Sequence, residues 1–164
     1  MKVASVLFLS ALLGSTLAWE PSVPANTIAP VPYPEGYRTW THVKSTLISA
    51  THKNFEAMGG FQHFYANPAG MAGYRTRVFP EGSIVVVEWL EMQDNAGAFV
   101  EGPRRRLDVM VKDSVRYAAS GGWGFQRFAR DSKTELAATP TPAQCFACHT
   151  ALKKDGLVLS TYRQ

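Results

Sequence analysis

The chain has 164 residues and a formal net charge of +4, and 46% of its residues are hydrophobic. A chain of this size buries roughly two-thirds of its surface on folding, so one self-sufficient domain is expected. The modest charge excludes an extended basic surface for nucleic acid. The one basic run, Arg104-Arg105-Arg106, follows Gly102-Pro103 and indicates a solvated loop, with at most a weak role in docking an acidic redox partner.

The first 18 residues have the pattern of a secretory signal peptide. Lys2 precedes an apolar run over residues 3–13, and small residues follow up to Ala18. The run is shorter than the roughly 20 apolar residues that span a bilayer, so no stable membrane insertion is expected. We therefore predict export to the periplasm, an extended proline-rich lead-in over residues 19–37, and a single folded domain over residues 38–164.

From residue 40 onward, apolar residues recur at helical spacing. Trp40, Val43, Leu47, Ile48, Phe55 and Met58 fall near one face, which predicts a helix that ends at Gly59-Gly60. Residues 61–66 then predict a strand, residues 68–76 a short helical or irregular segment, and residues 79–82 a turn.

The middle of the chain is rich in strand signals. Strands are predicted over residues 83–91, 107–112 and 123–128, a last strand over residues 157–162, and a helix around the cysteines that follow Pro140. These elements indicate an α+β fold, a mainly antiparallel β-sheet with helices packed at its ends.

The only two cysteines lie in one motif near the C-terminus, Cys145-Phe146-Ala147-Cys148-His149. Two thiols at this spacing can add to the two vinyl groups of one haem, and the histidine that follows is then held at the iron. A thioredoxin-like pair is expected early in a βαβ unit, and zinc needs a second ligand pair. A structural disulfide across two residues is strained. Covalent haem attachment is therefore the favoured interpretation, with one haem c per chain.

The sequence also addresses the sixth position of the iron. No methionine follows His149, and the upstream Met58, Met71, Met92 and Met110 are interpreted as packing residues. His42, His52 and His63 are interpreted as surface or hydrogen-bonded core histidines. We therefore predict a five-coordinate iron that is ligated by His149 and has an open distal face, as ligand binding or catalysis requires.

Several segments together resemble the cytochrome P-460 family. They are Asn67-Pro68, Phe79-Pro80-Glu81-Gly82-Ser83 entering a valine-rich strand, Val111-Lys112-Asp113-Ser114, Gly122-Trp123-Gly124-Phe125, the haem motif, and Leu157-Val158-Leu159-Ser160. The resemblance covers most of the chain after the signal peptide. It implies a mainly antiparallel β domain with a covalently bound c-type haem, usually assembled as a homodimer.

The family that the chain resembles contains two functional kinds. P-460 cytochromes oxidise hydroxylamine and carry a lysine cross-linked to the haem, whereas cytochromes c′-beta lack this cross-link and bind small gases such as nitric oxide. The resemblance places Val87 at the cross-linking position, and valine cannot form that bond. Phe64, which alternates with Gln62 and Ala66, is expected to face the haem, and Val85, Val87 and Trp89 to form an apolar wall without a proton acceptor.

The sequence thus favours a periplasmic gas-binding cytochrome whose haem is held by Cys145, Cys148 and His149, with Phe64 and Val87 beside it. A haem oxidoreductase acting on hydroxylamine or peroxide and a simple electron carrier are the alternatives. The expected partners are a small gaseous or nitrogenous ligand, a redox protein and a second copy of the chain.

Overall fold

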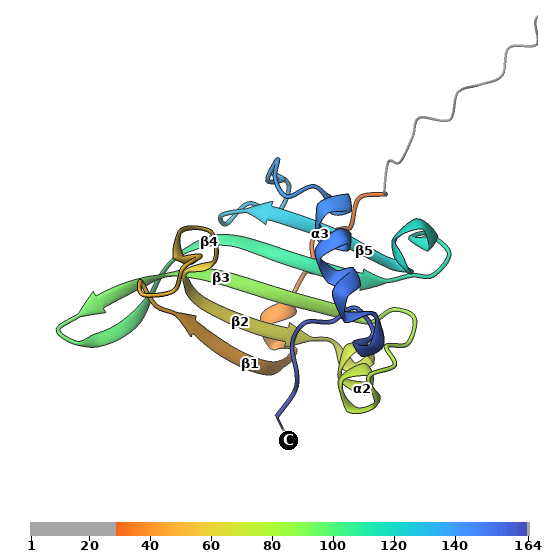
Figure 1. Ribbon diagram of the computed structural model, residues 1–164, viewed down its shortest axis with the longest axis horizontal. Helices are drawn as coiled ribbons and strands as arrows, with labels where there is room; N and C mark the ends of the chain where they lie inside the picture. The colour runs from red at the N-terminus through yellow and green to blue at the C-terminus, as the bar shows by residue number, and fades with distance from the viewer. Residues whose placement is uncertain (1–28, 164) are drawn as a thin grey trace, which may run out of the picture.

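The fold is built on one antiparallel sheet, seen in a computed structural model that describes residues 29–163. The predicted signal peptide and the first part of the lead-in lie outside the described residues. Five strands follow one another in space as they do in sequence (Figure 1). They are β1 (Thr41–Ile48), β2 (Gly60–Ala66), β3 (Ile84–Asn95), β4 (Ala98–Lys112) and β5 (Trp123–Ala129). The α+β prediction is confirmed.

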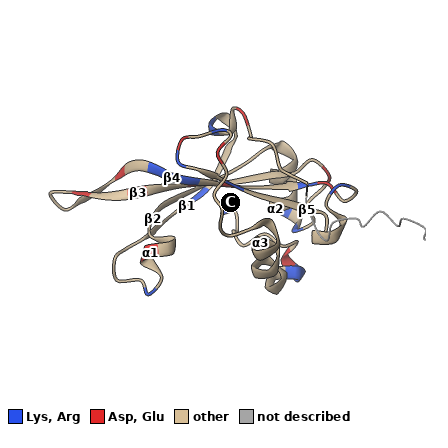
Figure 2. Ribbon diagram, turned by 90° about the horizontal axis from the view of Figure 1, so that it is seen from above, with Lys and Arg blue, Asp and Glu red and all other residues tan. Residues whose placement is uncertain are grey.

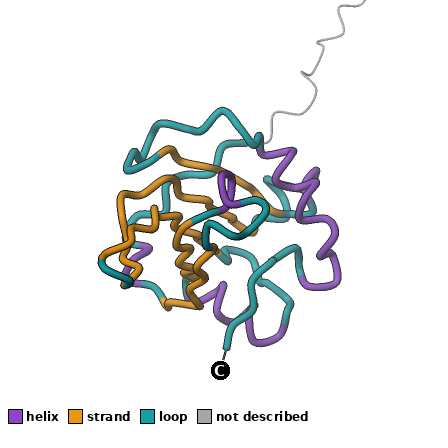
Figure 3. The backbone as a smooth tube through the Cα atoms, turned by 60° about the vertical axis from the view of Figure 1, so that its left-hand side comes forward, coloured by secondary structure: helices purple, strands orange, loops and turns teal. Residues whose placement is uncertain are grey.

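Short helices connect and cover these strands (Figure 3). They are η1 (Tyr37–Thr39), α1 (Phe55–Met58), α2 (Pro68–Thr76), η2 (Ala118–Ser120), α3 (Pro142–His149) and η3 (Thr150–Asp155). Seen along the sheet, α1 and α3 lie on the same side of it (Figure 2). None of the helices within residues 29–163 has the length and apolar character needed to cross a membrane.

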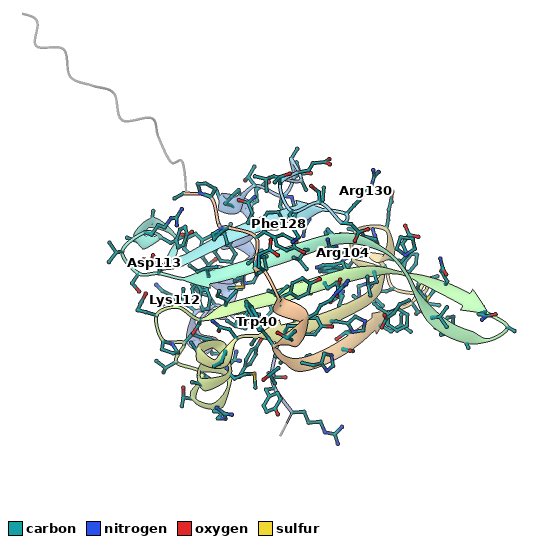
Figure 4. The ribbon with its side chains drawn as sticks, turned by 180° about the vertical axis from the view of Figure 1, so that it is seen from behind. Trp40, Arg104, Lys112, Asp113, Phe128 and Arg130 are labelled. Atoms are coloured by element: carbon teal, nitrogen blue, oxygen red, sulfur yellow. The ribbon has the colours of Figure 1, made fainter. Side chains whose placement is uncertain are left out.

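Each face of the sheet has its own core, because side chains alternate between faces along a strand. The α3 face buries Val85, Met110 and Phe125 together with Tyr74 and Phe79, and Cys145 and Phe146 pack against this cluster. The far face is covered by residues 29–40 and is seen in Figure 4. Its core contains Val31, Tyr37, Val86, Leu107, Val109, Tyr117 and Phe128.

The helix predicted from residue 40 is wrong over most of its length. Residues 41–48 form strand β1, which pairs with β2, and only residues 55–58 are helical. Thr41, Val43, Thr46 and Ile48 are β-branched, and β-branched residues pack well on a pleated sheet, so pairing with β2 outweighs the helical spacing. After α1 the chain enters β2 at Gly60, which has φ +94°, and any Cβ there would lie 2.1 Å from the Leu90 carbonyl oxygen.

The arginine triplet is not a solvated loop. It lies within β4, and Arg104 is buried, with its Nε donating to the Arg130 carbonyl at 2.6 Å. Arg105 and Arg106 donate to the carbonyls of Gly59 and Ala57 at the end of α1, at 2.6 and 3.0 Å. The triplet therefore binds the molecule's own backbone rather than forming an exposed basic patch.

The predicted last strand, residues 157–162, is also wrong. These residues have no strand partner in the described part of the chain. Their carbonyl groups accept hydrogen bonds from side chains instead, chiefly from Arg77. Hydrogen bonds from side chains thus take the place of the backbone hydrogen bonds that a strand would make. The predicted strands within residues 61–66, 84–91, 107–112 and 123–128 and the helix at the cysteine motif are all present.

Candidate haem-binding site

Helix α3 begins with a strong local signal. Thr141 is its N-cap: the Thr141 side chain accepts from the Gln144 backbone N–H at 3.3 Å, and the Gln144 side chain accepts from the Thr141 N–H at 2.8 Å. Pro142 occupies the first turn, where its missing N–H costs nothing. This capping box fixes the helix start just before Cys145. Residues three apart on a helix lie on one side, so Cys145 and Cys148 present their thiols together.

Both thiols are free. Cys145 is half-buried and Cys148 is exposed. Burial raises the pKa of the Cys145 thiol, the nearby Asp108 carboxylate acts in the same direction, and Arg127 opposes both. The site thus offers two unbridged thiols on one side of α3, as two thioether bonds to one haem require.

His149 has the geometry of an iron ligand. Its Nδ1 lies 2.6 Å from the Leu157 carbonyl oxygen. A carbonyl only accepts, so Nδ1 carries the proton and Nε2 keeps its lone pair. Burial lowers the pKa of His149, and the hydrogen bond to Leu157 and the charge of Asp108 oppose this shift. The lowered pKa favours the neutral ring, which is the form that binds metals.

The sheet brings Phe64 and Val87 together beside α3. In the strand register Phe64 pairs with Val87 and Val87 with Asp108, so the three side chains point to one face. All three are half-buried, and Phe64 packs at the margin of the core cluster that contains Cys145. This row extends to Arg127, the partner of Asp108 on β5. Phe64 and Val87, the two residues expected near the haem, thus lie in one row with Asp108 and Arg127 across four strands.

The sequence interpretation missed the charged half of this row. Arg127 donates to Asp108 twice, from Nε at 2.6 Å and from Nη2 at 2.7 Å, and Arg106 Nε lies 3.7 Å from the same carboxylate. The wall around Val87 is therefore not purely apolar, which corrects the expectation of a face without a proton acceptor. The register of β3 and β4 is needed to see that Asp108 lies across from Val87, and alternation along β3 alone does not show it.

Trp89 lies on the same face as Val85 and Val87, as expected, but a charged side chain covers it. It is 7% exposed, and the Arg106 guanidinium lies 3.7 Å from the centre of its ring. Burial lowers the pKa of Arg106 to about 10, although Asp108 acts in the opposite direction. The stack of Arg106 on Trp89 closes this end of the face beside α1.

Two of the remaining histidines point away from α3. The rings of His42 and His63 lie on the far face, joined through Ser45, whose Oγ lies 2.9 Å from His42 Nε2 and 2.7 Å from His63 Nδ1. His63 Nε2 in turn lies 2.7 Å from Glu101. A polar cavity of about 650 Å³ opens on this face, lined by Arg38, His42, His63, Glu88 and Arg104 among others, and it is separate from the cysteine motif.

His52 is exposed in the loop before α1. Its Nδ1 accepts from the Asn54 backbone N–H at 3.1 Å, so the proton of the neutral ring sits on Nε2. A ring held in this way presents no lone pair at Nε2. Met71 and Met110 are buried in the core, as packing residues should be.

The residues present therefore fit a covalently bound haem. Two free thiols share one side of α3, the imidazole beside them has its Nε2 available, and a half-buried row of the sheet lies next to both. A cysteine pair and a histidine on a C-terminal helix, packed on an antiparallel sheet, define the class of β-sheet c-type cytochromes.

A comparison with family models supports this class. The Cytochrome P460 model matches residues 34–160, which is well over half of the chain. The chain belongs to the cytochrome P460 family, and the family implies a haem cofactor. No curated protein matches the chain.

Proposed function

We propose that this protein is a periplasmic mono-haem c-type cytochrome that binds small gases such as nitric oxide at a five-coordinate iron. The observation that carries the proposal is the pairing of Phe64 with Val87 beside α3. Neither side chain has an atom that could ligate the iron or cross-link to the haem. His42 and His63 lie on the far face, so they do not compete for the sixth position.

In this proposal each residue of the site has one task. Cys145 and Cys148 anchor the haem covalently, and His149 donates its Nε2 lone pair while Leu157 fixes the tautomer. Phe64 and Val87 keep water away and limit the space for a ligand. The haem supplies the iron, which binds the gas. Export by residues 1–18 and assembly into a homodimer are part of the proposal, and they rest on the signal pattern and on the family.

Asp108 favours a second candidate function. Oxidation of hydroxylamine releases protons as well as electrons, so a positioned base is expected near the reacting group. The carboxylate of Asp108 lies directly across from Val87 on the same face, held by Arg127. Asp108 is therefore the carboxylate that would act as this base in an oxidase of the family, although the cross-linking lysine is absent at residue 87.

Turnover of hydroxylamine with an artificial electron acceptor separates the two functions. We expect the purified holoprotein to bind nitric oxide and to show negligible turnover, and the mass of its haem peptide to show no lysine adduct. Robust turnover that is lost in Asp108→Asn but kept in Asp94→Asn would replace the gas-binding proposal with the oxidase. Asp94 is a suitable control because it accepts from the Gly97 N–H in the hairpin between β3 and β4. A protein that binds neither gas nor hydroxylamine would be a simple electron carrier.

A further inference from the structure

The C-terminal segment is held by one arginine. Arg77 Nη1 donates to the Ser160 carbonyl at 3.0 Å, and its Nη2 donates to the carbonyls of Asp155 and Val158 at 3.0 and 2.8 Å. Its side chain is 28% exposed, and its Nε lies 4.0 Å from the Asp155 carboxylate. A guanidinium has five donors in a fixed plane, so it can hold three backbone carbonyls at once in a way that a lysine cannot.

Arg77 is itself fixed to the sheet. It ends α2, where its N–H donates to the Gly73 carbonyl at 2.7 Å. The start of α2 is tied to β3 through Asn67, whose side chain accepts from the N–H groups of Gly70 and Ile84 at 2.8 and 2.9 Å. Tyr74, also on α2, places its hydroxyl 2.6 Å from the Ser160 hydroxyl. Helix α2 is therefore a firm support for the tail.

Leu157 lies between the carbonyls that Arg77 holds. It is 7% exposed and has φ +66°, a backbone conformation that favours glycine and that a leucine keeps only when its surroundings impose it. In this conformation its carbonyl oxygen accepts from His149 Nδ1 at 2.6 Å. The contacts of Arg77 to residues on both sides of Leu157 thus determine where the partner of His149 lies.

We infer that Arg77 is a positioning residue for the proximal ligand, acting through the Leu157 carbonyl, an inference that rests on the proposed ligation of the iron by His149. A hydrogen bond from Nδ1–H to a carbonyl makes the imidazole more electron-donating and fixes the direction of its ring. Holding that carbonyl still keeps this bond short in both oxidation states. When a haem is bound, this would strengthen the iron–histidine bond and would stabilise the oxidised iron relative to the reduced iron.

Resonance Raman spectroscopy and redox titration of the holoprotein test this role. In Arg77→Met, the iron–histidine stretch of the ferrous protein should move to lower frequency and the midpoint potential should rise. Arg75→Met is the matched control, because Arg75 is exposed on the same helix and takes part in none of the hydrogen bonds described for the tail. It should leave both quantities unchanged. Arg77→Lys keeps the charge but not the planar set of donors, so it should shift both in the same direction as Arg77→Met.

The outcomes separate this inference from the proposed function. Haem staining on a denaturing gel reports attachment in every variant. Absence of bound haem in the wild-type protein would contradict the proposed function. Bound haem with an unchanged stretch and potential in Arg77→Met would overturn the role of Arg77 alone. If Arg77→Met does not fold, Arg77→Lys decides: a shift of both quantities supports the inference, and no shift overturns it.

Discussion

The two faces of the sheet are built from the same strands, yet they differ in which of their residues the rest of the chain leaves partly uncovered. On the far face Val86 and Leu107 are 0% exposed and Val109 is 2% exposed, under residues 29–40. On the α3 face, Val85, Met110 and Phe125 are buried with α2 and α3, and Trp89 is buried nearer α1. The next row, Phe64 with Val87 and Asp108, is half-buried. The far face has an opening of its own, the polar cavity lined by Arg38, His42 and Glu88. The α3 face differs in that its half-buried row lies near Cys145 and His149, where a group anchored to α3 would be placed.

The charged residues follow the same division. On the far face Glu88 is 2% exposed and accepts from the Tyr37 hydroxyl at 2.7 Å and from Arg38, while Arg104 lies 3.7 Å away. Burial and the hydrogen bond to Glu88 raise the pKa of Tyr37 well above its ordinary value. On the α3 face Asp108 is less buried, with its side chain 25% exposed. We infer that the buried charges hold the fold together and the half-buried pair serves the site.

The largest effect is expected from the cysteines. Cys145→Ala combined with Cys148→Ala should abolish haem that survives denaturing electrophoresis, because no other cysteine exists in the chain. The apoprotein should still unfold cooperatively, since neither residue is fully buried. Each single variant should keep one thioether bond. Haem that remains covalently bound in the double variant would show that Cys145 and Cys148 are not the attachment residues.

Removal of the buried Glu88 carboxylate from the far face should lower the stability of the fold and leave the haem site unchanged. Glu88→Ala removes the acceptor of Tyr37 and Arg38 and one of the two carboxylates near Arg104. Asp131 still lies 3.2 Å from Arg104, so the loss of stability should stay below the about 3–5 kcal/mol expected when a buried charge is left without a partner. Thermal unfolding measures the loss, and the absorption spectrum should stay the same. Glu101→Ala is the control, because its side chain is 56% exposed and pairs with His63 at the surface. A changed haem spectrum in Glu88→Ala would show that the two faces are not independent.

The smallest effect concerns Phe64. If its ring limits access to the iron, Phe64→Ala should speed the binding of carbon monoxide. A steric barrier lowered by about 1.4 kcal/mol makes binding roughly tenfold faster. Phe61→Ala is the matched control, because Phe61 stacks on His63 on the far face. Flash photolysis measures both rates. Equal rates in the two variants would make Phe64 an ordinary core residue.

The success of sequence reasoning also differs between regions. The cysteine motif and the strand at residues 84–91 were predictable because each is a continuous local pattern. Strand β1 was not, because its spacing also fits a helix and only pairing with β2 decides between them. Asp108 was missed for a related reason: its place beside Val87 depends on the register between strands. Arg77 reaches residues about eighty positions away, which no local pattern reports.

The absorption spectrum of the ferrous protein, with and without nitric oxide and carbon monoxide, tests the central claim most directly. We predict a five-coordinate high-spin haem c before addition, a new spectrum with each gas, and loss of the high-spin spectrum in His149→Ala. A six-coordinate low-spin spectrum that neither gas changes would contradict an open distal face and the gas-binding function built on it.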